Sequence, residues 1–289
     1  MQCSRFVQGA QGNSKMKVLI STDIEGVAGV VDVQQVRAGN VEYERARQWM
    51  TAEANAAVVG AFEGGATEVY VNDSHGGFRN IIATGIDARA TLITGKPRVY
   101  SMMAGLEFDV DAVALVGHHS RAQGRGVLAH TINSSAFARV LVNDLELGEP
   151  GLYGALAGEA GVPVIFGSGD QVFIEENTGF FDGAVWVQTK RAMGHSSAAT
   201  LTPEAACEGI RQGMHKAVQN AIARSMTPFV IEAPYECRLQ TNSPAQADMF
   251  CILPGTERVD GVTLSFRAAS MENVIRTLNV FSTMSAALR

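Results

Sequence analysis

The sequence predicts an α/β protein, with a mostly parallel sheet flanked by helices and a smaller α+β second domain. Short apolar runs alternate with stretches whose apolar residues recur every three or four positions, as strands alternate with helices. Tight turns join these segments, and the 289 residues include 30 glycines. After about Lys190 the alternation weakens, and short strands fall between two helices.

The first region is expected to supply the parallel sheet. Its strands are predicted at 17–21, 68–72, 91–93, 111–117, 137–142 and 162–166. A helix is predicted over 42–64, where Tyr43, Ala46 and Met50 share one face and Gly65 follows the end. A second helix is predicted over 151–161. Parallel strands joined by helices make a sheet that is covered on both faces.

The second region is expected to be smaller and mixed. A long helix is predicted over 203–223, strands near 229–233, 247–252 and 262–266, and a last helix from 271 to about 288. We therefore divide the chain into an α/β domain over 16–190 and a smaller α+β domain over 191–289. Residues 1–15 lack the apolar core of a signal peptide and are expected to form a disordered leader.

Composition excludes several classes of partner. The chain carries 23 basic and 29 acidic residues, a formal net charge of −6, and no Lys/Arg block, which argues against nucleic acid. No stretch approaches the roughly 20 apolar residues that span a bilayer, so no membrane partner is expected. The four cysteines form no C-x-x-C pair, which favours reduced thiols and a cytoplasmic location.

Polar side chains follow directly on three of the predicted strands. Asp23 and Glu25 follow the first, Asp73 and His75 the second, and His118 and His119 the strand over 111–117. In open α/β sheets, ligands bind outside the carboxyl ends of the strands. We therefore expect these six side chains to converge on one edge of the sheet.

Carboxylates and imidazoles together are the ligand set of a zinc or manganese site. Asp23 and Glu25 are alternate residues leaving a strand, so they face the same side. A surplus carboxylate can bridge two ions at about 3.5–4 Å, as in two-metal hydrolases. The alternative is that the acids cap loops and the histidines are hydrogen-bonded members of the core. For any single histidine that alternative is favoured. For the carboxylates and histidines taken together, a metal site is favoured.

Five short motifs occur in order and together resemble one known family. They are Asp23-Ile-Glu25-Gly26, Asn72-Asp-Ser-His75, Gly117-His-His119, Gly126-Val-Leu-Ala-His130 and Asn143-Asp-x-x-x-Gly148-Glu149. The set resembles the M55 family of D-aminopeptidases, from about Met16 to the C-terminus. The resemblance implies two zinc ions per chain and a ring-shaped homodecamer. It also implies five metal ligands, which are Asp23, Glu25, His75, His119 and Glu149.

The resemblance further implies that His130, eleven residues after His119, is the catalytic residue. Three roles are open to it: stabilising the oxyanion, moving a proton to the leaving amine, or direct attack. One departure concerns His118, which stands where the family pattern has tyrosine. His118 is expected either to donate a hydrogen bond to a ligand or to line the substrate pocket. Asp73 is expected to hold the substrate amine, orient a ligand or close a turn.

The expected function is a metal-dependent aminopeptidase that hydrolyses the N-terminal bond of short peptides, of the D-Ala-D-Ala type, with water activated at two zinc ions. Two alternatives are kept. One is a two-metal amidohydrolase or phosphoesterase, for which only Arg79, Arg121 and Arg125 offer phosphate partners near the predicted strand ends. The other is a non-catalytic metal-binding assembly protein.

Overall fold

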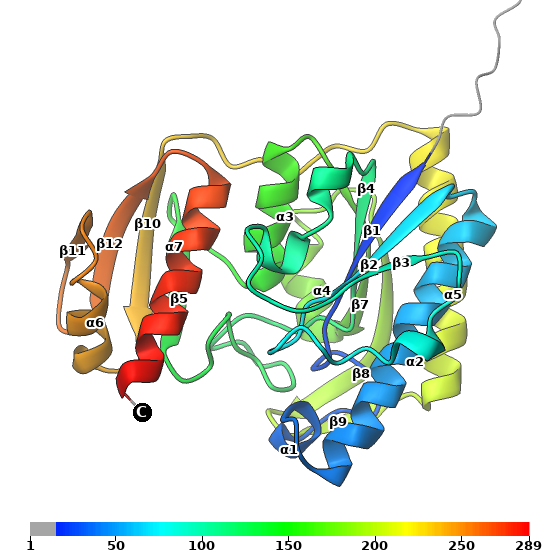
Figure 1. Cartoon of the computed structure of the whole chain (residues 1–289), viewed down its shortest axis with the longest axis horizontal. Helices are drawn as coiled ribbons and strands as arrows, with labels where there is room; N and C mark the ends of the chain where they lie inside the picture. The colour runs from blue at the N-terminus through cyan, green and yellow to red at the C-terminus, as the bar shows by residue number, and fades with distance from the viewer. Residues whose placement is uncertain (1–15, 289) are drawn as a thin grey trace, which may run out of the picture.

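A computed structural model describes residues 16–288, so the leader expected over 1–15 lies outside the described residues. A seven-stranded sheet forms the larger part (Figure 1). Its order is β3 (Thr91–Ile93), β2 (Glu68–Asp73), β1 (Lys17–Thr22), β4 (Ala112–Val116), β7 (Val164–Asp170), β8 (Val185–Gly194) and β9 (Ser197–Thr200). All neighbours pair in parallel except β8 and β9, which confirms the mostly parallel α/β class.

Helices cover this sheet on both faces. The long helices α2 (Val41–Gly64) and α5 (Pro203–Ala223) pack against each other on one face, and α3 (Glu149–Glu159) lies on the other (Figure 1). Residues of β1 alternate between these layers: Val18 and Ile20 belong to the apolar cluster under α2 and α5, and Leu19 to the cluster beside α3. This is the period of two expected of a strand buried on both faces.

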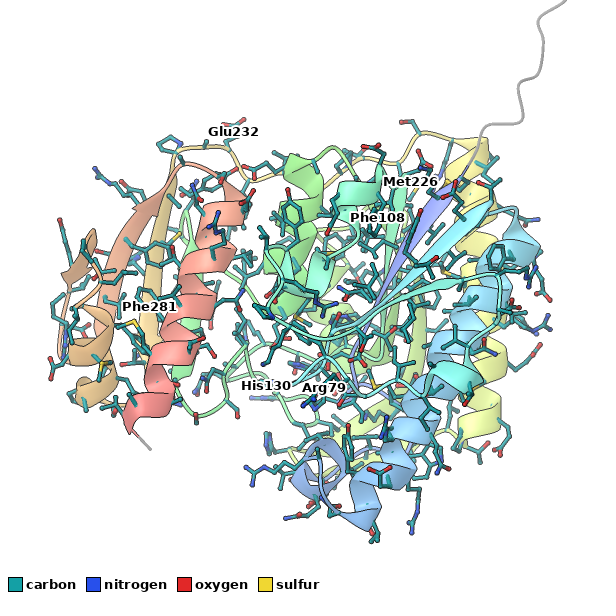
Figure 2. All side chains as sticks on the ribbon, in the orientation of Figure 1. Arg79, Phe108, His130, Met226, Glu232 and Phe281 are labelled. Carbon is teal, nitrogen blue, oxygen red and sulfur yellow. The ribbon has the colours of Figure 1, made fainter. Side chains whose placement is uncertain are left out.

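A second, antiparallel sheet lies beside the first. Its order is β11 (Thr256–Arg258), β12 (Thr263–Ala268), β10 (Tyr235–Thr241), β5 (Phe137–Val142) and β6 (Leu145–Glu146). Helices α6 (Pro244–Phe250) and α7 (Met271–Met284) pack on one face of it. Phe281 of α7, labelled in Figure 2, stacks on Phe250. Helix α7 also contacts α3, so one apolar cluster joins the two sheets.

Short elements complete the chain. They are α1 (Val33–Val36), α4 (Gln171–Asn177) and the 3-10 turns η1 (Ala83–Gly85), η2 (Ser101–Met103), η3 (Leu106–Phe108) and η4 (Ser285–Leu288). Within residues 16–288, no helix combines the length and apolar character needed to cross a membrane.

Two predicted strands of the second region are wrong. Residues 229–233 have no regular structure, and β10 begins only at Tyr235. Residues 247–252 lie mostly in helix α6, because Ser243 caps the amide of Gln246 and Pro244 fits the first helical turn. The apolar run from Ala247 to Ile252 is too short for its pattern to distinguish a helix from a strand.

The pairing of one strand also differs from the sequence analysis. Strand β5 was expected in the parallel sheet, but it pairs with β10 in the antiparallel one. The division of the chain at residues 190 and 191 remains a prediction, and that boundary falls within β8.

Candidate metal centre

The ladder of the large sheet brings distant residues to one edge. Thr22, the last residue of β1, is opposite Asp73 of β2 and Val116 of β4. The pairing continues past the strand ends, because the Asp23 amide donates to the Val116 carbonyl at 2.8 Å. Asp23 therefore lies between the segments that carry His75 and His119.

Two glycines let the first and fourth strands leave the sheet in close contact. A Cβ on Gly26 would lie 2.0 Å from the His118 carbonyl oxygen, and one on Gly117 would lie 2.4 Å from that of Asp23. Gly117 also has a φ of +69°, in the left-handed region that favours glycine. The glycines of both motifs are thus required by the close approach of the two loops that carry Glu25 and His119.

The first of two clusters consists of Asp23, Glu25 and His75. Nδ1 of His75 lies 3.2 Å from Oδ1 of Asp23 and 3.2 Å from Oε2 of Glu25. Both carboxylates are buried, with relative exposures of 2% and 3%. Their ligand atoms are close enough together to hold one metal ion.

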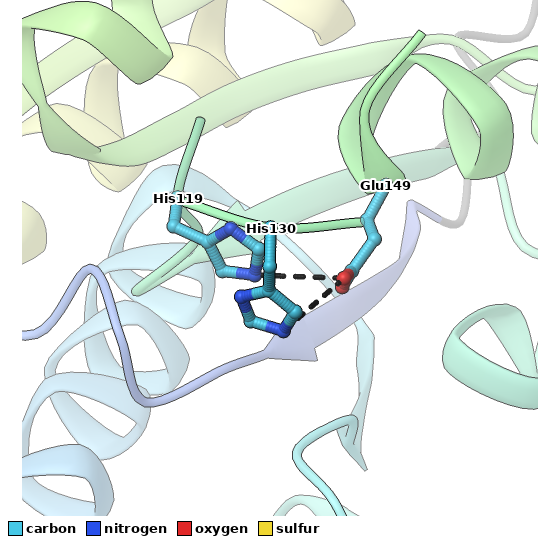
Figure 3. Close-up of side chains that lie close together, drawn as sticks. All are labelled: His119, His130 and Glu149. Atoms are coloured by element: carbon cyan, nitrogen blue, oxygen red, sulfur yellow. Dashed lines mark ion pairs between the residues drawn. The ribbon is translucent and has the colours of Figure 1, made fainter. Parts of the chain in front are cut away.

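The second cluster consists of His119, His130 and Glu149 (Figure 3). Nε2 of His119 and Nε2 of His130 each lie 3.6 Å from the same oxygen of Glu149, and the two rings stack with centroids 4.1 Å apart. Glu149 is the first residue of α3, and its Oε1 accepts the amide of Ile132 at 2.6 Å.

Backbone carbonyls orient the three imidazoles. Nε2 of His75 lies 2.7 Å from the Val36 oxygen, and Nδ1 of His119 lies 2.9 Å from the Ser120 oxygen. Nδ1 of His130 lies 2.9 Å from the Leu128 oxygen. A carbonyl can only accept, so each of these nitrogens carries a proton. In the neutral ring the other nitrogen then directs a lone pair at the carboxylates, as in histidines that bind metals.

Asp23 joins the two clusters. Its Oδ1 faces His75, and its Oδ2 lies 3.5 Å from Nε2 of His119. Burial alone would lower the pKa of both histidines, but the neighbouring carboxylates raise both well above the usual value. Burial likewise opposes ionisation of Glu149, yet His119 lowers its pKa to about 2. The arrangement therefore stabilises positive charge between the carboxylates.

The donor set fits a metal ion. Oε2 of Glu25 and Nε2 of His119 are buried and have no hydrogen-bond partner. An unsatisfied buried acceptor is costly, and a cation placed among the carboxylates would satisfy both atoms. Oxygen and imidazole ligands of this kind suit zinc.

Two side chains at the strand ends do not face the site. His118 is fully buried, its Nε2 lies 3.2 Å from the Ser21 oxygen, and it does not line the pocket beside the clusters. Burial lowers the pKa of His118. Both oxygens of Asp73 accept hydrogen bonds from the Asn80 and Ile81 segment, at 2.5 to 2.8 Å. Asp73 therefore closes a loop, and it is fully buried and does not line the cavity, so it is out of reach of a substrate amine.

A cavity of about 170 Å³ opens beside the clusters. Asp23, His75, His130 and Glu149 line it, together with residues from the loops after β2 and β3 and from α7. None of Arg79, Arg121 and Arg125 lines it. A larger hollow of about 910 Å³ lies over the second sheet and contains no residue of either cluster.

A buried lysine, Lys190, lies behind the first cluster and was not among the predicted site residues. Nζ of Lys190 donates to the carbonyls of Glu25, Val27 and Val30 at 2.5, 2.8 and 2.5 Å. Burial lowers the pKa of Lys190 to about 8, although the neighbouring Glu53 opposes the shift. Lys190 belongs to β8, which was not predicted, so no pattern linked it to the loop of Glu25.

Known proteins resemble this chain along most of its length. The family model Peptidase_M55, described as D-aminopeptidase, matches residues 16–280. A D-aminopeptidase of Bacillus subtilis (strain 168) is 30% identical over 271 residues, which cover 93% of this chain and 98% of that protein.

Solved structures include a similar chain. It is the Zn-dependent D-aminopeptidase DppA from Bacillus subtilis, described as a self-compartmentalizing protease. The two chains superpose with a TM-score of 0.90 at 29% identity, over 94% of this chain and 98% of that one.

Proposed function

The chain belongs to the M55 family of D-aminopeptidases, and we propose that it removes the N-terminal residue of short peptides containing D-amino acids, such as D-Ala-D-Ala. As a member of this family it is a metal-dependent aminopeptidase. The observation that carries the proposal is the pair of ligand clusters joined by Asp23 beside a small cavity. A cavity of about 170 Å³ is smaller than the roughly 300–1,000 Å³ of most ligand pockets, which favours a short substrate.

We assign the two clusters to two zinc ions, with Asp23, Glu25 and His75 at one and His119 and Glu149 at the other. Asp23 supports the pairing because it directs one oxygen at each cluster. Zinc supplies Lewis acidity, which polarises a substrate carbonyl and lowers the pKa of water to about 7. Zinc dependence is also stated for the similar Bacillus subtilis structure.

His130 is the proposed catalytic residue. Its distance to Glu149 would also allow it to bind a metal, but its side chain is 19% exposed and faces the cavity, whereas that of His119 is 1% exposed. With its Nδ1 proton held by the Leu128 oxygen, Nε2 is free to accept a proton from the attacking water and pass it to the leaving amine. Of the three roles left open, this tautomer disfavours a hydrogen bond from Nε2 to the oxyanion and fits both direct attack and proton transfer, of which we propose proton transfer.

Assembly and location complete the proposal. We propose a ring-shaped homodecamer in the cytoplasm, with peptides entering from an enclosed space. The description of the similar structure as self-compartmentalizing supports an assembly of this kind. Residues 191–289, the proposed second domain, would shape the pocket through Asn279 and Ser282 of α7 and would contribute to assembly.

The test is a substrate panel with zinc-loaded protein. We expect release of D-alanine from D-Ala-D-Ala, little turnover of L-Ala-L-Ala, and loss of activity after treatment with a chelator. Turnover of a phosphodiester without peptide cleavage would replace the proposal with a phosphoesterase. Bound zinc with no turnover of any D- or L-aminoacyl substrate would leave a metal-binding assembly protein instead.

A further inference from the structure

We propose that Lys96 binds the C-terminal carboxylate of a dipeptide substrate and so makes this chain prefer free dipeptides to their amides. The inference rests on the proposed aminopeptidase activity and extends it, because it names the part of the substrate that the other end of the pocket recognises. Lys96 lies in the segment between β3 and η2, outside every motif of the sequence analysis.

The cavity is lined by charged groups of two kinds. Asp23, Glu149 and the imidazoles belong to the proposed metal site, and Lys96 contributes an ammonium. The rest of the wall is mixed, with apolar side chains such as Phe78 and Met102 and polar ones such as Tyr153 and Asn279. Lys96 is the one lysine or arginine among the described residues that line this cavity. The pocket thus offers separate places for a positive and a negative group.

The Lys96 ammonium is held in place but keeps free donors. Nζ donates to the Gly76 carbonyl at 2.9 Å and lies 5.5 Å from the centre of the Phe78 ring. An ammonium has three N–H groups, so two remain available. Across residues 16–288, no carboxylate lies within ion-pair distance of Lys96. A bound substrate carboxylate would serve as the counter-ion of Lys96.

The position of Lys96 also fits a dipeptide. Gly76 directly follows His75, so the hydrogen bond ties the ammonium to the loop that carries a proposed metal ligand. In a dipeptide the carboxylate is one residue beyond the bond that is cut, and one residue spans only about 3.8 Å. In a longer peptide the carboxylate lies further from the bond that is cut, and an amide presents no charge to Lys96.

Charge sets the direction of the substrate. Its C-terminal carboxylate would be attracted by Lys96, and its α-ammonium would be repelled by Lys96. The N-terminal residue therefore faces the metal clusters, as an aminopeptidase requires, and the C-terminal carboxylate faces Lys96.

The experiment compares D-Ala-D-Ala with D-Ala-D-Ala amide. We expect Lys96→Met to raise KM for the free dipeptide about tenfold with little change in kcat, because a charged hydrogen bond made equally in the bound and transition states is lost. KM for the amide should not change. Lys96→Arg should restore most of the difference, since the charge is kept. The matched control is Lys216→Met, which removes an exposed lysine on α5 away from the cavity.

The possible results separate this inference from the proposed function. An equal rise in KM for both substrates, or no rise for either, overturns the role of Lys96 while leaving the aminopeptidase activity in place. Failure of the wild-type protein to cleave either substrate overturns that activity and the Lys96 site with it. Zinc content and far-UV circular dichroism of each variant exclude misfolding as the cause.

Discussion

The two ligand clusters are built in different ways. Asp23, Glu25 and His75 lie at the ends of β1 and β2, and the hydrogen bonds of a parallel ladder fix their relative positions. In the second cluster only His119 follows a strand, β4, whereas His130 comes from a loop and Glu149 from the start of α3. The sheet itself positions the first cluster, but the second depends on how a loop and a helix pack against the sheet.

The hydrogen bonds that hold the two clusters in place differ as well. The Lys190 ammonium holds the Glu25 loop through three carbonyls, and a single amide, that of Ile132, holds Glu149. His130 is more exposed than His119, although both approach the same oxygen of Glu149. We therefore propose that the first cluster serves only to bind metal, and that the second combines metal binding with the residue that moves protons.

The change with the largest expected effect removes the link between the clusters. Asp23→Asn leaves one acceptor oxygen where the carboxylate offered two, so we expect loss of at least one zinc ion and a fall in kcat/KM of more than about 100-fold. Zinc per chain and D-alanine release measure both effects. Asp87→Asn, which alters a carboxylate paired with Arg89, is the control. Full zinc content in Asp23→Asn would show that Asp23 binds neither ion.

The next change separates a ligand from the catalytic residue. We expect His130→Ala to keep its zinc and lose about 10²–10⁴-fold in kcat, the usual contribution of a general acid–base group. His75→Ala should lose zinc as well as activity, because the first cluster offers three ligands among residues 16–288. Equal loss of zinc in the two variants would make His130 a metal ligand.

A smaller effect is expected behind the first cluster. Lys190→Met leaves the carbonyls of Glu25, Val27 and Val30 without their donor, so the Glu25 loop should shift. We expect affinity for the first zinc ion to fall by about 10–100-fold, as for other residues that orient ligands, with affinity for the second unchanged. Calorimetric titration of the metal-free protein resolves the two sites. A lower melting temperature with both affinities intact would limit Lys190 to a structural role.

An effect of a different kind, on folding stability rather than on activity, is expected at the buried carboxyl group of Glu53, near Lys190. Burial raises the pKa of Glu53 from 4.5 to about 7, although a hydrogen bond from Ala28 and the charge of Lys190 oppose the shift. Between these values the unfolded chain loses the proton and the folded chain keeps it, so stability from this group falls as pH rises. Relative to Glu53→Gln, the wild type should lose up to about 3 kcal/mol from low to neutral pH.

Urea unfolding of metal-free wild type and metal-free Glu53→Gln at about pH 5 and pH 8 measures this change in relative stability. The other titrating groups are present in both proteins. The same gap in stability between wild type and Glu53→Gln at the two pH values would show that Glu53 titrates normally despite its burial.

The first cluster was easier to predict from the sequence than the second, because it lies at strand ends. Apolar runs ending in Asp23, Asp73 and His119 predicted the strand ends, because the carboxyl edge of a parallel sheet follows from local pattern alone. His130 and Glu149 were identified through resemblance to a family, since no periodicity places a loop or the start of a helix beside a given strand.

Other features could not be read from local pattern. The position of Lys190 depends on β8 lying beside β7, a pairing set by the whole sheet. Strand β5 was recognised, but its membership of the second sheet depends on contacts with β10, almost a hundred residues away. The motif Gly117-His118-His119 did not reveal that His118 points into the core, because strand-end residues can turn either way once the ladder stops.

The most direct test of the central claim, an aminopeptidase in which two zinc clusters act together, is a zinc titration of the metal-free protein. D-Alanine release from D-Ala-D-Ala is measured after each addition of zinc. We predict that activity rises until about two equivalents per chain are bound, because Asp23 couples both clusters to the reaction. Full activity at one equivalent, or none at two, would contradict the account.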